Sequence, residues 1–179
     1  MQPTTILHFW FNELTDKQHF AKDAALDALI AKRFGALLEQ AGRCELFGWR
    51  ATPAGRLAEV LVLDQFSRNV WRNTPRAFAQ DAQALCLAQE LVLRGDDAQL
   101  PVAQRRFAYM PYMHSESLVV HQEALRLFDL PGLEDNLHFE QRHLAIVQRF
   151  GRYPHRNAIL GRASTPQELA FLQEPGSGF

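Results

Sequence analysis

The stretch that decides the fold is Leu57–Arg72, which reads LAEVLVLDQFSRNVWR. Its first half is apolar almost all round, as expected of a helix that is buried on most of its sides. At about 100° per residue, Asp64 falls on the same helix face as Leu57 and Leu61, so the spacing places a carboxylate in the core. A buried charge is costly unless it is paired, and Arg68 lies one turn further along the same face. We therefore expect a central buried helix that carries a polar centre.

Helix start signals recur on both sides of this stretch. Thr-Pro pairs begin at Thr52, Thr74 and Thr165, and each combines an N-cap with a proline at the first helical position. Glu168 stands three residues after Thr165 and completes a capping box. Apolar spacing also predicts one long helix over residues 16–41, which Gly42 would end.

No segment alternates polar and apolar residues with period two, so we expect no β-sheet. Pro111 is predicted to break the helix that follows Pro101, and Ser115 is predicted to cap the next one. The prediction is an all-α protein of roughly seven to nine helices, packed as antiparallel hairpins where the loops are short. We expect a single domain over residues 1–179, with loose residues at about 174–179.

Composition excludes several classes of protein. With 47% hydrophobic and 22% charged residues, the chain is typical of a soluble globular protein, and no apolar run approaches the roughly 18 residues of a membrane-spanning helix. A net charge of −1 gives no general case for nucleic-acid binding, and the N-terminus does not resemble a signal peptide. Cys44 and Cys86 form no CxxC motif, which favours a reduced cytoplasmic setting with both thiols buried.

Three polar patches interrupt the apolar pattern, each at a predicted helix end. They are Asp64–Asn69 with Trp71 and Arg72, Met110–Glu116, and Arg149–Asn157 with Gly161 and Arg162. Arginine suits bidentate pairing with a carboxylate or a phosphate, so an anion site is the sharpest interpretation. The alternative is a structural salt-bridge network between the arginines and the nearby acids, namely Asp27, Asp64, Asp81 and Glu116.

We expect the three patches to converge in space. An inward carboxylate such as Asp64 has more acceptor sites than Arg68 alone can fill. The third patch lies in a stretch, residues 141–162, that holds five arginines and no acid. Its arginines therefore need partners from elsewhere in the chain.

Metal and covalent chemistry have less support. His114, His143 and His155 are acceptable metal ligands, together with an acid of the patches, but no HxxxH or HxH pair is present and the arginines would repel a cation. Ser115 beside His114 is the one nucleophile candidate, and it is better explained as an N-cap. The phosphate-loop and dinucleotide glycine patterns are absent, so we expect no metal and no cofactor.

The combination of motifs resembles the bacterial family catalogued as domain of unknown function 924. The matching residues are FWF at Phe9–Phe11, TPAGRLAEVLVLDQFSRNVWR at Thr52–Arg72, TPRAFAQD at Thr74–Asp81, MPYMHSE at Met110–Glu116, RFGRYPHRN at Arg149–Asn157 and LGR at Leu160–Arg162. Ser67 departs from the motif, which often has proline there. The resemblance implies an all-α fold similar to tetratricopeptide-like helical hairpins. It carries over no catalytic residue, because the family has no assigned activity.

Two classes of function remain. The first is a small-molecule site or enzyme for an anionic ligand, and the second is a tetratricopeptide-like module that binds a protein or peptide. The residues for a ligand site, or for a buried polar network, are Asp64, Gln65, Arg68, Asn69, Arg72, His114, Glu116, His143, Arg149, Arg152, His155, Arg156 and Asn157. In an enzyme, His114 or Glu116 would act as general acid or base. The polar motifs adjoin predicted core positions, which favours the first class over an exposed binding groove.

Overall fold

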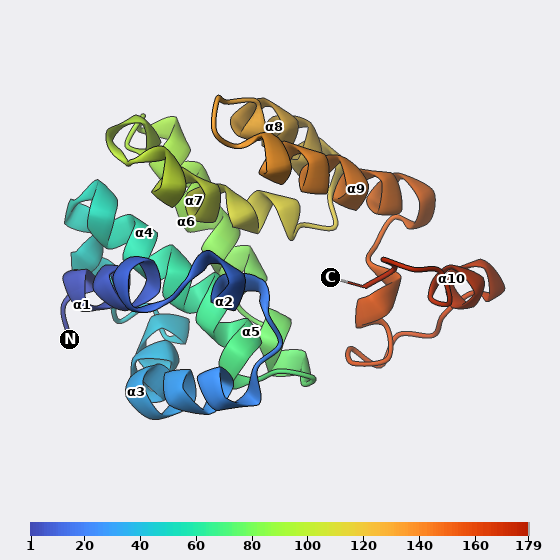
Figure 1. Cartoon of the computed structure of the whole chain (residues 1–179), viewed down its shortest axis with the longest axis horizontal. Coiled ribbons are helices and arrows are strands. Elements are labelled where there is room, and N and C mark those ends of the chain that lie inside the picture. The colour runs from blue at the N-terminus through green and yellow to red at the C-terminus, as the bar shows by residue number, and fades with distance from the viewer. Residues whose placement is uncertain (179) are drawn as a thin grey trace.

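A helical rod made of α4 (Pro53–Leu61), a π-helical segment (Val62–Phe66) and α5 (Ser67–Val70) runs through the middle of the protein (Figure 1). The structure is a computed structural model that describes residues 1–178. Thr52 caps the rod as predicted, since its Oγ1 accepts a hydrogen bond from Gly55 N at 3.1 Å. All residues from 55 to 67 are buried, so the prediction of a central buried helix is confirmed.

The other helices surround this rod. They are α1 (Pro3–His8), α2 (Asp16–Phe20), α3 (Ala24–Gly42), α6 (Asp81–Leu93), α7 (Val102–Met113), α8 (Leu118–Phe128), α9 (Glu134–Phe150) and α10 (Pro166–Phe171). With α4 and α5 counted as one helix, residues 1–178 contain nine helices and no strand, which confirms the all-α prediction. The tetratricopeptide-like arrangement stays a prediction. Across the same residues, no helix combines the length and the apolar character that a membrane crossing needs.

Aromatic side chains from the first half of the chain build the main core. α4 contacts α1, α6 and α7, while α3 packs against the π segment and α5. The ring of Phe66 stacks on Phe34 at a centroid distance of 5.1 Å and meets the ring of Phe9 edge-on at 6.0 Å. Because Phe66 belongs to the π segment, this packing fixes that segment against α3.

The chain after α9 forms a smaller cluster beside the main body (Figure 1). α9 ends at Phe150, and Gly151 follows it with a left-handed φ of 71°, which suits glycine. Beyond it, Tyr153 and Phe171 pack against the last turns of α9. The predicted capping box of α10 is present, with Thr165 Oγ1 accepting from Glu168 N at 3.2 Å.

The long helix expected over residues 16–41 is two helices, α2 and α3. Ala21 has extended backbone angles (φ −79°, ψ 144°), and the chain turns there. Asp23 then caps α3, because its Oδ1 accepts from Ala25 N at 2.8 Å and from Leu26 N at 3.2 Å. The second Thr-Pro pair likewise begins only a 3-10 turn, Pro75–Phe78, and α6 starts at Asp81.

The predicted break at Pro111 is wrong, because α7 continues through Tyr112 to Met113. A proline removes one backbone donor, and the ladder resumes at once, with His114 N donating to Met110 O at 3.0 Å. The turn therefore lies one helical turn later than expected. Ser115 does not cap α8 directly; its Oγ accepts from Ser117 N at 3.2 Å inside that turn.

One further expectation fails at the surface. Cys44 and Cys86 are both exposed, since Cys44 lies in a turn with a φ of 60° and Cys86 lies off the buried face of α6. In the tail, residues 174–176 and 178 are exposed, whereas Ser177 is buried and its Oγ donates to Leu172 O at 3.2 Å. Phe179 lies outside the described residues.

Candidate functional site

The polar centre lies in the π segment of the rod, where Asp64 is fully buried. Its Oδ1 accepts from His114 Nδ1 at 2.7 Å and lies 3.1 Å from Arg68 Nη1. Its Oδ2 accepts from Gln65 Nε2 at 2.6 Å. Three donors thus cover the carboxylate, as burial of a charge requires. π-Helical turns are rare overall, and many of those known lie at functional sites. The π segment therefore favours Asp64 as a functional residue.

These contacts determine the form of His114. Burial opposes ionisation of Asp64, but Arg68 and His114 outweigh it and hold the pKa of the carboxyl group well below its ordinary value. An ionised carboxylate only accepts hydrogen bonds, so Nδ1 of His114 carries the hydrogen and Nε2 is unprotonated. Burial, and then Arg68, lower the pKa of His114. His114 is therefore a neutral imidazole that a carboxylate orients.

A chain of ion pairs connects the three sequence patches. Arg68 bridges two acids, with Nη1 3.1 Å from Asp64 Oδ1 and 3.0 Å from Asp81 Oδ1. Asp81 Oδ2 lies 3.2 Å from Nη1 of Arg156, whose Nη2 donates to the carbonyl oxygen of His114 at 3.0 Å. The patches contribute Asp64, His114 and Arg156 respectively, so their predicted convergence is confirmed.

Arg156 is held between two aromatic rings. Its guanidinium carbon lies 4.7 Å from the ring centroid of Phe78 and 4.7 Å from that of Tyr153. Burial, and then Arg68, lower its pKa. Its Nε is buried and has no hydrogen-bond partner within residues 1–178. Arg156 therefore retains donor capacity at the point where the patches meet.

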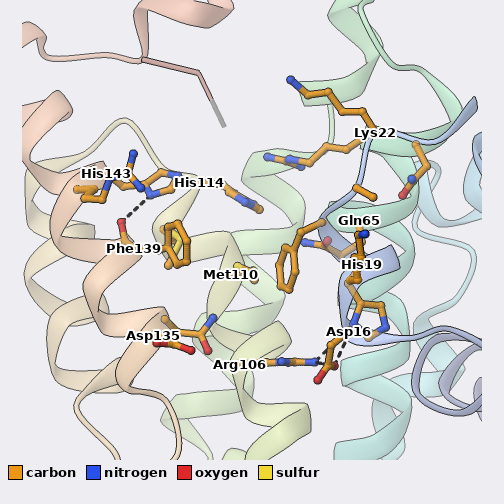
Figure 2. A pocket seen from close by; sticks show the side chains of 18 of the residues that line it. Asp16, His19, Lys22, Gln65, Arg106, Met110, His114, Asp135, Phe139 and His143 are labelled. Atoms are coloured by element: carbon orange, nitrogen blue, oxygen red, sulfur yellow. Dashed lines mark hydrogen bonds and ion pairs between the residues drawn. The ribbon is translucent and has the colours of Figure 1, made fainter. Parts of the chain in front are cut away.

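Two adjoining cavities open beside this polar centre. The larger has a volume of about 910 Å³ and is bounded by residues of α2, α7 and α9 (Figure 2). The smaller has a volume of about 370 Å³ and lies between α5 and the segment after α9. The two cavities meet along the residues that line both of them, here called the shared wall, namely Lys22, Arg68, Arg72, His114 and His143, with Gly178.

The charged side chains that line the smaller cavity are all cationic. Its charged lining residues are Lys22, Arg68, Arg72 and Arg156, and no carboxylate from residues 1–178 lines it. The acids that pair with these arginines are Asp27, Asp64 and Asp81, none of which lines either cavity. The network balances the charge of the arginines, yet the surface that faces the cavity is cationic.

Neutral imidazoles complete the walls. Burial lowers the pKa of His143 to about 3, and burial together with Arg156 lowers that of His155 to about 4. His143 Nδ1 lies 2.8 Å from the carbonyl oxygen of Phe139, to which it donates (Figure 2). At pH 7 these rings add hydrogen-bonding groups without charge. Within the described part of the chain, no three histidine, cysteine or acidic side chains are grouped to hold a metal ion.

Gln65, Asn69 and Arg72 also reach the larger cavity, as members of the first patch. Asp27 fixes two of them, because it accepts from Arg72 Nε at 2.5 Å and from Asn69 Nδ2 at 2.8 Å. The first patch therefore supplies most of the polar surface on the side of the rod.

Besides the buried Asp64, four residues predicted for the site line neither cavity, namely Glu116, Arg149, Arg152 and Asn157. Arg149 is exposed, and its Nη1 lies 3.9 Å from Glu174. Arg152 pairs with Glu168, with Nε 2.6 Å from Oε1. The first half of the third patch thus faces α10 rather than the polar centre.

The other two hold the C-terminal segment. Glu116 accepts from Tyr153 N at 2.7 Å and pairs with Arg162, whose Nη1 lies 2.7 Å from Oε2. Asn157 donates to Ser164 Oγ at 3.0 Å and accepts from Arg162 Nε at 3.0 Å. Both oxygens of Glu116 are thereby occupied, which leaves His114 as the general base candidate that faces a cavity.

Sequence reasoning missed Lys22 and the apolar lining of the larger cavity. Lys22 lies in the break between α2 and α3, which the apolar spacing spans without interruption. Phe20 precedes the same break, and Phe139 lies on α9. No motif surrounds these residues, so the sequence carries no signal that would have identified them.

Comparisons with known proteins agree with the fold and assign no activity. A solved structure described as a protein of unknown function from Agrobacterium tumefaciens is 38% identical, covers 96% of both chains and superimposes with a TM-score of 0.91. No curated protein matches the chain. The sequence model of a family described as bacterial protein of unknown function (DUF924) matches residues 6–176.

That match spans nearly the whole chain, including the rod, the His114 turn and the Arg156 segment. The chain therefore belongs to the DUF924 family of bacterial proteins of unknown function.

Proposed function

We propose that this protein binds a small anionic metabolite, a carboxylate or phosphate, in the smaller cavity, and that His114 acts on it as a general base. The carrying observation is the lining of that cavity, which contains four cationic side chains and no acid from residues 1–178. Cations that converge on one space from separate elements are the arrangement that recognises a carboxylate or phosphate. The acids behind them keep the arginines in place before the ligand arrives, which lowers the entropy cost of binding.

The same geometry supports a base at His114. Asp64 orients the ring through Nδ1, as the carboxylate of a catalytic triad orients its histidine. Nε2 then accepts a proton from the bound ligand or from a water beside it, and Asp64 stabilises the imidazolium that forms. His114 lines both cavities, so a ligand in either one meets this ring.

Anion titration with a matched pair of lysine variants tests the binding step. Lys22 lines both cavities, whereas Lys32 on α3 lines neither, and both side chains are exposed. Inorganic phosphate and succinate should raise the melting temperature of the parent protein at low salt. Lys22→Gln should weaken the apparent affinity about two- to fivefold, because an exposed ionic contact contributes about 0.5–1 kcal/mol. Lys32→Gln should leave it unchanged.

Two results would contradict the proposed anion site. If neither anion stabilises the parent, or if the two lysine variants lose affinity equally, the smaller cavity is not an anion site. The salt-bridge network would then be structural alone.

A further inference from the structure

We infer that the ligand is an anionic group attached to an apolar body, aromatic or aliphatic, and that this body occupies the larger cavity. The inference rests on the proposed anion site and adds the class of molecule that the site selects. It follows from the distribution of side chains along the larger cavity, which is polar and cationic at the shared wall and apolar further in.

The apolar part comes from three separate helices. Phe20 ends α2, Met110 and Met113 lie in the last turns of α7, and Phe139 lies on α9. In Figure 2, Phe139 and Met110 both lie below His114 and His143, and all four line the larger cavity, so the apolar surface adjoins the base. A ligand anchored at the cations would therefore extend directly onto these side chains.

Exposure of the two phenylalanines is the first argument for an apolar partner. Phe20 is 56% exposed and Phe139 is 44% exposed, and both line the cavity. Large apolar side chains gathered at one cavity mark a binding surface, whereas single ones scattered over a protein do not. The thioethers of Met110 and Met113 adapt readily to ligands of varied shape.

Volume is the second argument. The larger cavity measures about 910 Å³, at the upper end of the range of roughly 300–1,000 Å³ that pockets for organic ligands occupy. Inorganic phosphate or a short dicarboxylate would leave most of it filled with water. An aromatic ring or a medium-length acyl chain would displace that water from apolar walls, which is favourable.

Away from the shared wall, the larger cavity carries charges of both signs. Its lining there includes Asp16, Glu134 and Asp135 together with Lys17, Arg106 and Arg142. Asp16 is paired with Arg106, whose Nη2 lies 2.5 Å from its Oδ1 (Figure 2). The charged residues of the shared wall, in contrast, are all cationic, so the anionic group of the ligand is placed at that wall.

Two pairs of probes test the inference by calorimetric titration of the full chain. Phenyl phosphate should bind about tenfold more tightly than inorganic phosphate, because burying the ring adds a hydrophobic contribution. Octanoate should bind more tightly than acetate, because its acyl chain covers the apolar walls. Phe139→Ala should weaken phenyl phosphate about three- to tenfold and leave inorganic phosphate unchanged. Phe47→Ala is the matched control, since Phe47 is 70% exposed and lines neither cavity.

The outcomes separate the two proposals. If inorganic phosphate binds in a manner that depends on Lys22 but phenyl phosphate binds no more tightly, the apolar body is excluded and the anion site stands. If octanoate binds no more tightly than acetate, an acyl chain is excluded as the apolar body. If neither phosphate nor phenyl phosphate binds the parent, both proposals fall together.

Discussion

Asp64 both stabilises the core through its buried contacts and orients the ring of His114. Its carboxylate is fully buried and is covered by donors from Gln65, Arg68 and His114. Burial alone would raise the pKa of this carboxyl group and favour its protonated form, and Arg68 together with the hydrogen bonds from His114 and Gln65 keeps it ionised. The orientation of the His114 ring therefore depends on the same contacts that allow the carboxylate to exist in the core.

Replacing Asp64 with alanine should cost about 3–5 kcal/mol of the free energy of unfolding, because Arg68 loses a buried partner. Asp64→Asn should cost less, since an amide of the same shape retains part of the hydrogen bonding. Urea unfolding of the parent and both variants measures this difference. Sulfate should raise the stability of Asp64→Ala more than that of the parent, because Arg68 lines both cavities and can bind the added anion. An alanine variant as stable as the parent would contradict the assignment.

The histidines of the site make the protein sensitive to acid. The folded-state pKa is about 3 for His143 and about 4 for His155, whereas an unfolded histidine has a pKa near 6.5. Between pH 6.5 and 4 the unfolded chain binds protons that the folded chain does not. The contribution of these neutral histidines to the free energy of unfolding is therefore complete above pH 6.5 and is lost as the pH falls. Within this window, each histidine adds about 1.4 kcal/mol per pH unit to the slope of the free energy of unfolding against pH.

Urea unfolding at intervals from pH 7 to pH 4 checks this window. His143→Gln should reduce the slope of the free energy of unfolding against pH by about 1.4 kcal/mol per pH unit, because it removes the titration of one buried histidine. His138→Gln, an exposed change on the same helix, serves as the control and should retain the slope of the parent. Equal slopes in the parent and His143→Gln would show that His143 is protonated in the folded protein.

At the scale of elements, the start of α4 depends on a close approach of two backbones. Gly55 lies in the first turn of the rod, and a Cβ built there would lie 1.9 Å from the carbonyl oxygen of Trp49. No side chain fits at that distance, so the 3-10 turn Phe47–Ala51 can pack on α4 only if residue 55 is glycine. The position of the rod, and of Asp64 within it, rests partly on this contact.

A pair of glycine variants tests this point. Gly55→Ala should destabilise the protein by about 1–3 kcal/mol, because the turn must move away from α4. Gly35→Ala on α3 should stabilise it by about 0.5–1 kcal/mol, since a Cβ there meets nothing within 4 Å and alanine is the better helix former. Thermal and urea unfolding of the two variants should shift in opposite directions. A Gly55→Ala protein that gained stability would show that the turn yields freely.

At the scale of the whole molecule, the smaller cavity exists because the segment after α9 folds back onto the main body. Glu116 anchors that segment, since it accepts from Tyr153 N and pairs with Arg162. Arg156 then reaches Asp81, at the start of α6. The docking of one segment thus places a fourth cation opposite Lys22, Arg68 and Arg72.

Loss of the anchor should release this segment locally. Glu116→Ala leaves Arg162 without its carboxylate and Tyr153 N without its acceptor, each a cost of about 1–3 kcal/mol. Trypsin should then cleave after Arg162 about ten- to a hundredfold faster, while the melting temperature of the main body falls little. Glu123→Ala, which breaks the exposed pair with Arg126 on α8, should leave the cleavage rate unchanged. Equal cleavage rates in the parent and Glu116→Ala would mean that other contacts hold the segment.

Local physics in the sequence determined the class of fold and the identity of the polar centre. Thr52 and Thr165 cap their helices as expected, because capping depends only on a few neighbouring residues. Asp64 was recognised as buried because apolar periodicity reports which face of a helix meets the core, even where a π turn alters the spacing. The need of a buried charge for partners then predicted that distant arginines would join it.

Only the tertiary structure decided where α2 ends, which arginines face a cavity and what lines its apolar part. Arg149 and Arg156 belong to the same polar patch, yet one is exposed beside Glu174 and the other is buried between two rings. Such differences depend on how a segment docks, which is set by contacts between residues far apart in the chain. The prediction at Pro111 is wrong for the opposite reason. Proline disfavours a helix interior by about 3 kcal/mol, but burial of the whole last turn of α7 outweighs that local cost.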